Sequence, residues 1–394
     1  MLKKTEKRAG KQKVTAALFL CLIYMILSAG FGLGLTGCSS GAGASQSRGQ
    51  QSGESLNGES LNGQDDRLNV VTTIFPYYDF LRQIAGDRIR LTLVVPAGMD
   101  SHSFEPTPAD MITIQNADLL ICNGGAMEQW VDRVVTSFGE GEGPGRVETM
   151  MDYVDTVQEE IVEGMEHSHG HDAETHNAAT CEIEEHHHEE HPQEEHPHED
   201  EGPAYVDDGH GHEIEYDEHI WTSPVNAMEL TRVLSEVLSE EDSEHAESYR
   251  ANAAAYITEL EELDARFREV VAHGSRRLLV FGDKFPLRYF FDEYGLEYRA
   301  AFSGCSSDTE PSAKTIAYLI DKVREEEIPA VYYLELSSPR VAEIISEETG
   351  AEPLLFHTCH NLTRRQFDSG VTYLDLMRAN VAALQKGLNE WDYY

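Results

Sequence analysis

From Leu68 onward, short apolar segments with the composition of strands alternate with segments that have the spacing of amphipathic helices. In the first half of this region we expect strands over residues 68–75, 89–95 and 118–122, with helices over 76–85, 106–116 and 127–138. The second half repeats the pattern, with strands expected over 277–281, 298–302, 330–334 and 353–356 and helices over 286–294, 311–325, 339–348 and 371–388. Such alternation builds βα units. The sequence therefore predicts an α/β protein of two lobes, each with a small, mostly parallel sheet flanked by helices.

A long helix is expected to join the two lobes. Between residues 243 and 272 the apolar side chains follow steps of four and three residues, which makes one continuous stripe along a helix. A helix of roughly 30 residues is about 45 Å long, so it would form a stiff connection. We assign residues 68–224 to the first lobe, 225–273 to the linking helices and 274–394 to the second lobe, with a cleft between the lobes.

Residues 155–218 interrupt the alternation with a strongly acidic, histidine-rich segment. They contain 23 Asp and Glu, no Lys or Arg, and 12 of the 18 histidines. Scarce apolar residues and charge repulsion predict a disordered insertion. It could capture zinc for the rest of the protein, sense zinc weakly, or have no role. Its candidate auxiliary ligands are His167, His169, His171, His186, His187, His188, His191, His196, His198, His210 and His212.

The N-terminus is expected to direct the protein out of the cytoplasm. A basic start and the apolar run from Val14 to Leu35 lead to Leu-Thr-Gly-Cys at residues 35–38, which resembles the lipobox of bacterial lipoproteins. We expect residues 1–37 to be a signal peptide and Cys38 to be lipidated, with an uncleaved anchor as the alternative. Residues 38–67, rich in Ser, Gly, Gln and Asn, would be a flexible tether.

The overall charge limits the partners of the chain. It has 30 Lys and Arg against 71 Asp and Glu, a formal net charge of −41. Such an acidic surface repels phosphate backbones, which argues against nucleic-acid binding.

Several groups able to bind a metal follow predicted strands, where open α/β sheets bind ligands. His102 follows the second strand, and Asp283 follows the strand that ends at residue 281. His357 and His360 follow the strand that ends at residue 356, and His219 stands where apolar periodicity returns. Any one of them alone would be an ordinary loop residue, but together they predict a metal site.

The chain resembles the metal-binding solute-binding lipoproteins of zinc and manganese ABC importers, in the branch with a histidine-rich loop. The resemblance covers residues 68–390 and is carried by Gly98-x-x-x-His102-x-x-Glu105-Pro106-Thr107-Pro108, His219-Ile-Trp-Thr-Ser-Pro224, Tyr294-Gly-Leu296, Glu310-Pro311-Ser312 and Thr372-Tyr-Leu-Asp-Leu-Met377. It implies a rigid helix between the lobes and a metal held in the cleft. It also implies capture of Zn²⁺, or Mn²⁺, outside the cytoplasmic membrane for an ABC permease and its ATPase, by a lipid-anchored monomer.

The resemblance also assigns ligands. His102 and His219 match the first two histidines of the family. The third position is Lys284, which cannot ligate while protonated, so we expect its neighbour Asp283 to replace it. His360 is expected at the fourth position, with His357 as the alternative. Three imidazoles and one carboxylate suit tetrahedral Zn²⁺, whereas Mn²⁺ prefers more oxygen donors.

Two further predictions concern the cysteines and catalysis. Cys305 and Cys359 could form a disulfide across neighbouring strand ends and fix the loop of His360. No His-Glu-x-x-His or Walker-type motif occurs, so we expect no enzyme. Two alternatives to transport stay open: a surface adhesin or interaction lipoprotein with a structural zinc, and, more weakly, a zinc-dependent hydrolase.

Overall fold

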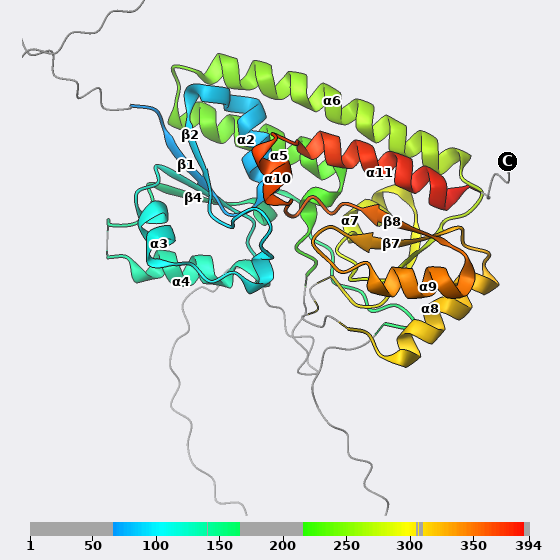
Figure 1. Cartoon of the computed structure of the whole chain (residues 1–394). Coiled ribbons are helices and arrows are strands. Elements are labelled where there is room, and N and C mark those ends of the chain that lie inside the picture. Colours follow the sequence, from blue (N-terminus) through cyan, green and yellow to red (C-terminus); the bar gives the residue numbers. More distant parts are fainter. Residues whose placement is uncertain (1–65, 140, 166–215, 305, 307–309, 390–394) are drawn as a thin grey trace, which may run out of the picture. The chain divides into compact units, whose positions relative to one another are not determined.

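The computed structural model describes residues 66–139, 141–165, 216–304, 306 and 310–389 (Figure 1). All of them belong to the second of two units, Gln64–Tyr394. The predicted signal peptide, Cys38 and nearly all of the predicted tether lie outside the described residues. No helix in the described part of the chain is long and apolar enough to cross a membrane.

The first lobe is built on a parallel four-stranded sheet. Its strands have the order β2-β1-β3-β4. The lobe contains β1 (Asn69–Thr72), α2 (Phe75–Ala85), β2 (Arg90–Leu93), α3 (Pro108–Gln115), β3 (Leu119–Cys122), α4 (Gln129–Ser137) and β4 (Arg146–Thr149), with short 3-10 turns between them. The inner strand β3 reads Leu-Leu-Ile-Cys and is buried at every residue, as expected for a parallel strand covered on both faces.

The second lobe repeats this architecture. Its parallel sheet has the order β6-β5-β7-β8. The elements are β5 (Leu278–Phe281), α7 (Arg288–Tyr294), β6 (Glu297–Ala300), α8 (Ala313–Glu325), β7 (Ala330–Leu334), α9 (Arg340–Thr349), β8 (Glu352–Phe356), α10 (Arg364–Asp368) and α11 (Tyr373–Leu388). The expected α/β fold with two small parallel sheets is confirmed.

Two helices connect the sheets. Ser223 caps α5 (Pro224–Glu241), and α6 (Ala246–His273) then runs 28 residues, about 42 Å at 1.5 Å per residue. It packs on α5 and contacts both α2 of the first lobe and α11 of the second (Figure 1). Its buried residues include six of the predicted stripe: Tyr249, Ala253, Tyr256, Leu260, Leu263 and Phe267.

The main hydrophobic core is continuous through both lobes. It contains residues of α2, α5, α6, α7 and α11 and side chains from both sheets. A smaller core lies under α3 and α4, and another under α8 and α9. Each sheet therefore has one face in the shared core and one face under its own helices.

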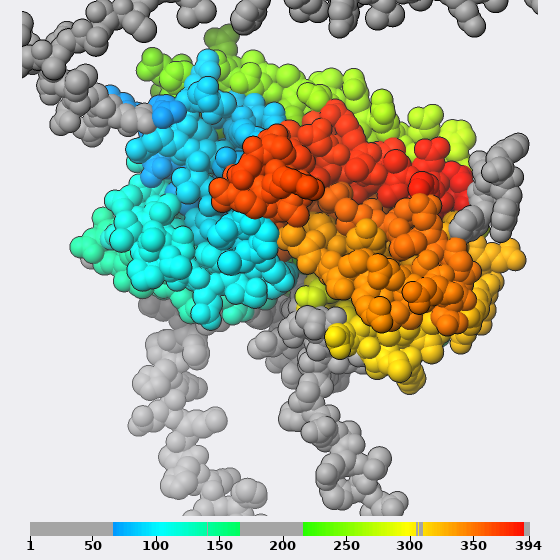
Figure 2. Space-filling view, in the orientation of Figure 1, coloured from blue at the N-terminus to red at the C-terminus, as the bar shows by residue number. Residues whose placement is uncertain are grey.

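A buried carboxylate joins the first helix of the first lobe to the last helix of the second. Asp79 of α2 is fully buried, and its Oδ2 accepts the backbone N–H of Tyr373 at 2.7 Å. Its Oδ1 pairs with Arg82, whose guanidinium also reaches the carbonyl of Val371 at 3.3 Å. The space-filling view shows the orange-red surface of α10, which precedes α11, directly against the blue and cyan first lobe (Figure 2).

The structure differs from the expectation in the first lobe and at the insertion. We did not expect β4, an edge strand of alternating polar residues. The predicted disorder over 155–218 is too wide, because Gln158 and Tyr216 form an antiparallel bridge and Asp217 donates its amide to Val157 at 2.9 Å. Residues 166–215, with every auxiliary histidine named above, lie outside the described residues.

Candidate metal centre

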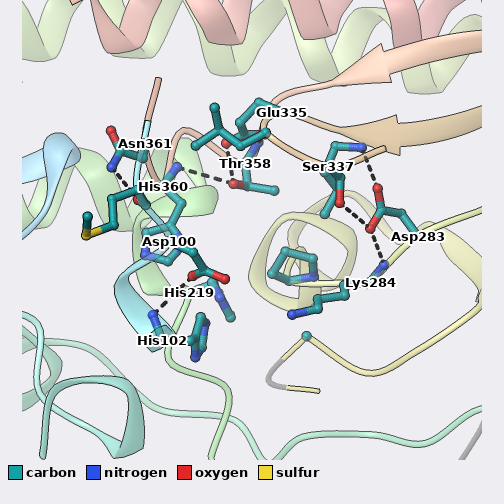
Figure 3. A pocket seen from close by; sticks show the side chains of 15 residues that line it. Asp100, His102, His219, Asp283, Lys284, Glu335, Ser337, Thr358, His360 and Asn361 are labelled. Atoms are coloured by element: carbon teal, nitrogen blue, oxygen red, sulfur yellow. Dashed lines mark hydrogen bonds between the residues drawn. The ribbon is translucent and has the colours of Figure 1, made fainter. Parts of the chain in front are cut away.

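Three histidines from distant parts of the chain converge on one point. His102 lies in the 3-10 turn Ser101–Ser103 after β2, His219 precedes the turn Ile220–Thr222, and His360 follows β8. One ring nitrogen of each lies within 4.8 Å of the others. Their ring centroids are 5.7 Å apart for His102 and His219, 5.6 Å for His102 and His360, and 5.8 Å for His219 and His360. The structure thus brings together three of the four predicted ligands (Figure 3).

These histidines line a cavity of about 120 Å³ to which both lobes contribute. The remaining walls are Met99, Asp100, Asp283, Lys284, Pro286, Gly304, Leu334, Glu335, Leu336, Ser337, Thr358 and Asn361. The site therefore lies where the loops at the strand ends of the two sheets meet, as the position of ligand sites in open α/β sheets predicts.

A buried carboxylate orients His219. Oδ1 of Asp217 lies 3.0 Å from Nδ1 of His219 and also accepts its backbone N–H at 2.8 Å. Both side chains are buried. A ring nitrogen that donates to a carboxylate leaves the other nitrogen with its lone pair, and such partners commonly orient metal-bound histidines. Asp217 therefore directs Nε2 of His219 toward the cavity.

The residue between them fastens this segment to the first lobe. The Glu218 carboxylate accepts the backbone N–H groups of Ala126 and of Met127, the latter at 2.9 Å. Gly125 has φ +79°, and a Cβ on it would lie 2.6 Å from the Glu218 carboxylate. A glycine is needed there because any side chain would displace Glu218, and with it the backbone of His219.

His360 belongs to the second lobe and is held by contacts from the first lobe. Its Nε2 is hydrogen-bonded to the hydroxyl of Ser101. The Trp221 ring lies 5.2 Å from its ring, and the Trp221 indole N–H donates to the carbonyl of Thr358 at 2.9 Å. The ring of His360 is thus fixed by residues that neighbour His102 and His219.

The next residue ties the two ligand loops together. The side-chain amide of Asn361 donates to the carbonyls of Pro96 at 3.0 Å and Met99 at 2.7 Å. The loop that carries His360 in the second lobe is therefore bonded directly to the loop that carries His102 in the first.

The electrostatics leave two imidazoles neutral at pH 7. Burial lowers the pKa of His102 to about 4, and burial together with His102 and His219 holds the pKa of His360 well below its usual value. Burial alone would lower the pKa of His219, but its interaction with Asp217 outweighs burial and raises that pKa. Neutral imidazole is the ligand form, so His102 and His360 are ready for a cation.

The donor set fits zinc. Nitrogens bound tetrahedrally to Zn²⁺ at about 2.0–2.1 Å are about 3.4 Å apart. The three ring nitrogens lie within 4.8 Å of one another, so a closure of at most about 1.4 Å brings them onto one ion. Imidazoles suit Zn²⁺, whereas hard ions such as Mg²⁺, Ca²⁺ and Mn²⁺ prefer oxygen ligands.

Asp283 does not join the histidines. Its Oδ1 accepts the amide of Lys284 at 2.8 Å and the hydroxyl of Ser337 at 3.0 Å, and its Oδ2 accepts the amide of Leu334 at 3.0 Å. The carboxylate therefore stabilises the ends of β5 and β7 and lies outside the group of possible ligands among the described residues. We expected Asp283 to be the third ligand, but the structure does not place it with the three histidines.

The alternatives around His360 have a clear outcome. His357 is buried next to Asn380, outside the group, so the structure places His360 rather than His357 at the site. Cys359 is a free thiol inside the main core, which is against the expected disulfide. Its predicted partner, Cys305, lies outside the described residues.

Sequence reasoning missed the residues that support the ligands. Asp217 lies two positions before His219. A carboxylate this close in sequence to a candidate ligand could have indicated a hydrogen-bond partner for its ring. Ser101 and Trp221 lie within the motifs that contain His102 and His219, but nothing in the sequence shows that both contact His360.

The profile of the protein family ZnuA, described as zinc-uptake complex component A, periplasmic, matches residues 70–387. The chain belongs to this family. This is a family of solute-binding components of transport systems and not a family of enzymes. Its members act outside the cytoplasm. The resemblance to the solute-binding proteins of zinc importers, inferred from the sequence motifs, is therefore confirmed.

Curated relatives and solved structures also match this family. The high-affinity zinc uptake system protein ZnuA of Bacillus subtilis is 30% identical over 85% of this chain and 92% of its own length. The zinc-binding lipoprotein AdcA of Streptococcus pneumoniae (R6) is 29% identical over 82% of this chain, which spans only 56% of AdcA. The Zn(II)-bound ZnuA-like domain of Streptococcus pneumoniae AdcA has a TM-score of 0.60 and 25% identity, over 82% of this chain and 100% of that one.

Proposed function

We propose that the chain captures one Zn²⁺ ion through His102, His219 and His360 and delivers it to an ABC importer. The observation that carries this proposal is the convergence of three imidazoles, two of them neutral at pH 7, in a cavity at the meeting point of two lobes. The zinc-uptake ZnuA of Bacillus subtilis and the zinc-binding AdcA support zinc as the cargo.

The partners follow from membership of an uptake complex. A solute-binding component hands its ion to a membrane permease driven by a cytoplasmic ATPase. We further propose that the chain acts as a monomer anchored to the outer face of the cytoplasmic membrane through lipid on Cys38, and that it catalyses no reaction. The expected lobe boundaries, 68–224 and 274–394, are part of this proposal.

Metal titration tests the site. We expect the full chain to bind zinc at one tight site, in competition with a chromogenic chelator, plus weaker sites. Replacement of His102, His219 or His360 by alanine should weaken the tight site more than about 100-fold, beyond the cost of losing an outer-shell partner. His357→Ala is the matched control, because His357 is a buried histidine three residues from His360 but outside the group. Tight binding retained in all three ligand variants would disprove the site.

A structural zinc, as in the adhesin alternative, makes a different prediction. The three ligand segments are held by protein contacts such as Asp217 with His219 and Asn361 with Met99. We therefore expect the protein to stay folded when a chelator removes zinc, whereas a structural site would unfold. Circular dichroism with and without chelator distinguishes the two.

A further inference from the structure

A lysine forms part of the cavity that holds the three histidines. Lys284 is half-buried in the wall contributed by the second lobe, and its side chain extends toward His102 and His219 (Figure 3). Its charge is close enough to contribute to the lowered pKa values of His102 and His360. A positive group beside a cation site is a cost unless something negative lies between them.

Within the described residues this ammonium group forms no direct ion pair, although the charge of the neighbouring Asp283 acts on it. No carboxylate there lies within ion-pair distance of Lys284, although the cavity wall contains acids. The Asp283 carboxylate accepts hydrogen bonds from the amides of Leu334 and Lys284 and from the hydroxyl of Ser337. Glu335 accepts the amide of Thr358 at 2.8 Å and its hydroxyl at 2.5 Å, and Asp100 accepts the amide of His102 at 3.1 Å.

The histidines also leave the coordination of the ion incomplete. Tetrahedral zinc takes four ligands, and the ligand group in the described part of the chain has three members. Three neutral imidazoles leave the ion with its full double charge. The cavity of about 120 Å³ is several times the roughly 10–15 Å³ that one water molecule requires, so there is space for the ion and one more small ligand.

We propose that Zn²⁺ binds in this site together with one small carboxylate anion from solution, which supplies the fourth ligand and pairs with the ammonium group of Lys284. This inference rests on the proposed function. It makes Lys284 a determinant of co-anion binding. At the position where the resemblance implies a ligand, this chain has a positive group that would bind one from solution. Anion and metal then raise each other's affinity by the same factor, as linkage requires.

Cobalt spectroscopy tests the proposal, with acetate as the probe. The full chain is loaded with half an equivalent of Co²⁺, so that only the tight site fills, and titrated with sodium acetate against sodium perchlorate at constant ionic strength. We expect a saturable change in the visible absorption bands with acetate alone. Zinc affinity should rise about tenfold at saturating acetate, measured by chelator competition.

Two variants separate charge from size. Lys284→Met removes the charge with little change of length and should raise the acetate concentration for half-effect at least tenfold, whereas Lys284→Arg keeps the charge and should retain the response. Circular dichroism confirms that both are folded. An acetate response unchanged in Lys284→Met, or no stronger than that to perchlorate, overturns the co-anion proposal while leaving zinc capture intact. Absence of any tight cobalt or zinc site would instead overturn the proposed function.

Discussion

Oδ1 of Asp217 lies 3.0 Å from Nδ1 of His219, with both side chains buried. This pair fixes which nitrogen of the imidazole faces the cavity and supplies a negative charge behind the ligand. The effect on metal binding is twofold: the ring is held in one orientation, and its basicity is raised.

Asp217→Asn should therefore weaken zinc binding although it removes no ligand. Loss of an outer-shell carboxylate typically costs 10–100-fold in metal affinity, and we expect a loss in this range by chelator competition. Asp87→Asn is the control, since Asp87 is exposed in the first lobe. An affinity for Asp217→Asn equal to that of the control would show that the pair does not act on the metal.

Asp283→Ala should affect stability more than zinc affinity. The substitution leaves the buried amide of Leu334 without its acceptor, which should lower the free energy of unfolding by about 1–3 kcal/mol in urea titrations. Zinc affinity should change less than about tenfold, against more than about 100-fold for His360→Ala. A loss of affinity as large as that of His360→Ala would restore Asp283 as a ligand.

The metal-free protein should lose stability through His102 as the pH falls. Burial holds the folded pKa of His102 at about 4, below the ordinary value of about 6.5. The unfolded chain therefore takes up the proton first, so the contribution is intact above pH about 6.5 and is lost on acidification through pH 4. At pH 4 the loss is about 3 kcal/mol.

His102→Gln removes this term together with the effect of the His102 charge on His360, while the remaining groups titrate in both proteins. The free energy of unfolding in urea should fall less between pH 7.5 and 4.5 for the variant than for the wild type. Equal falls would mean that His102 titrates normally in the folded state.

Asn361→Ala should speed zinc release. The variant loses both hydrogen bonds to the loop of His102, while all three histidines remain. We expect the dissociation rate, measured by stopped flow into excess chelator, to rise about tenfold, equivalent to about 1.4 kcal/mol. Asn389→Ala, at the far end of α11, removes a local hydrogen bond and should leave the rate unchanged. Equal rates in the two variants would disprove a role for the bridge between the loops.

Most of the fold could be predicted from the sequence because its signals are local. Central strands such as Leu119–Cys122 are continuous apolar runs, and α6 carries its stripe at helical spacing. The edge strand β4 was not predicted because its sequence, Arg-Val-Glu-Thr, has no apolar run. Only Glu148 in it is buried. The predicted disordered insertion extended too far because Asp217 and Glu218 are buried, whereas acidic residues in an acidic segment are expected to be exposed to solvent.

The site was predictable in part for the same reason. His102, His219 and His360 stand at strand ends or in motifs, so their types and positions indicated ligands. Asp283 follows a strand end as well, but its role depends on which amides face it across β7, and no sequence pattern carries that information. Recruitment of Ser101 to His360 likewise depends on how the two lobes meet.

The bond between Asp79 and Tyr373 has a consequence for how the polypeptide acquires its shape. A ribosome would have made the whole first lobe, both linking helices and the second sheet before the amide of Tyr373 emerges, and until then Oδ2 of the buried Asp79 lacks this donor. A chain that ends before α11 is therefore expected to be less stable in its first lobe as well as in its second.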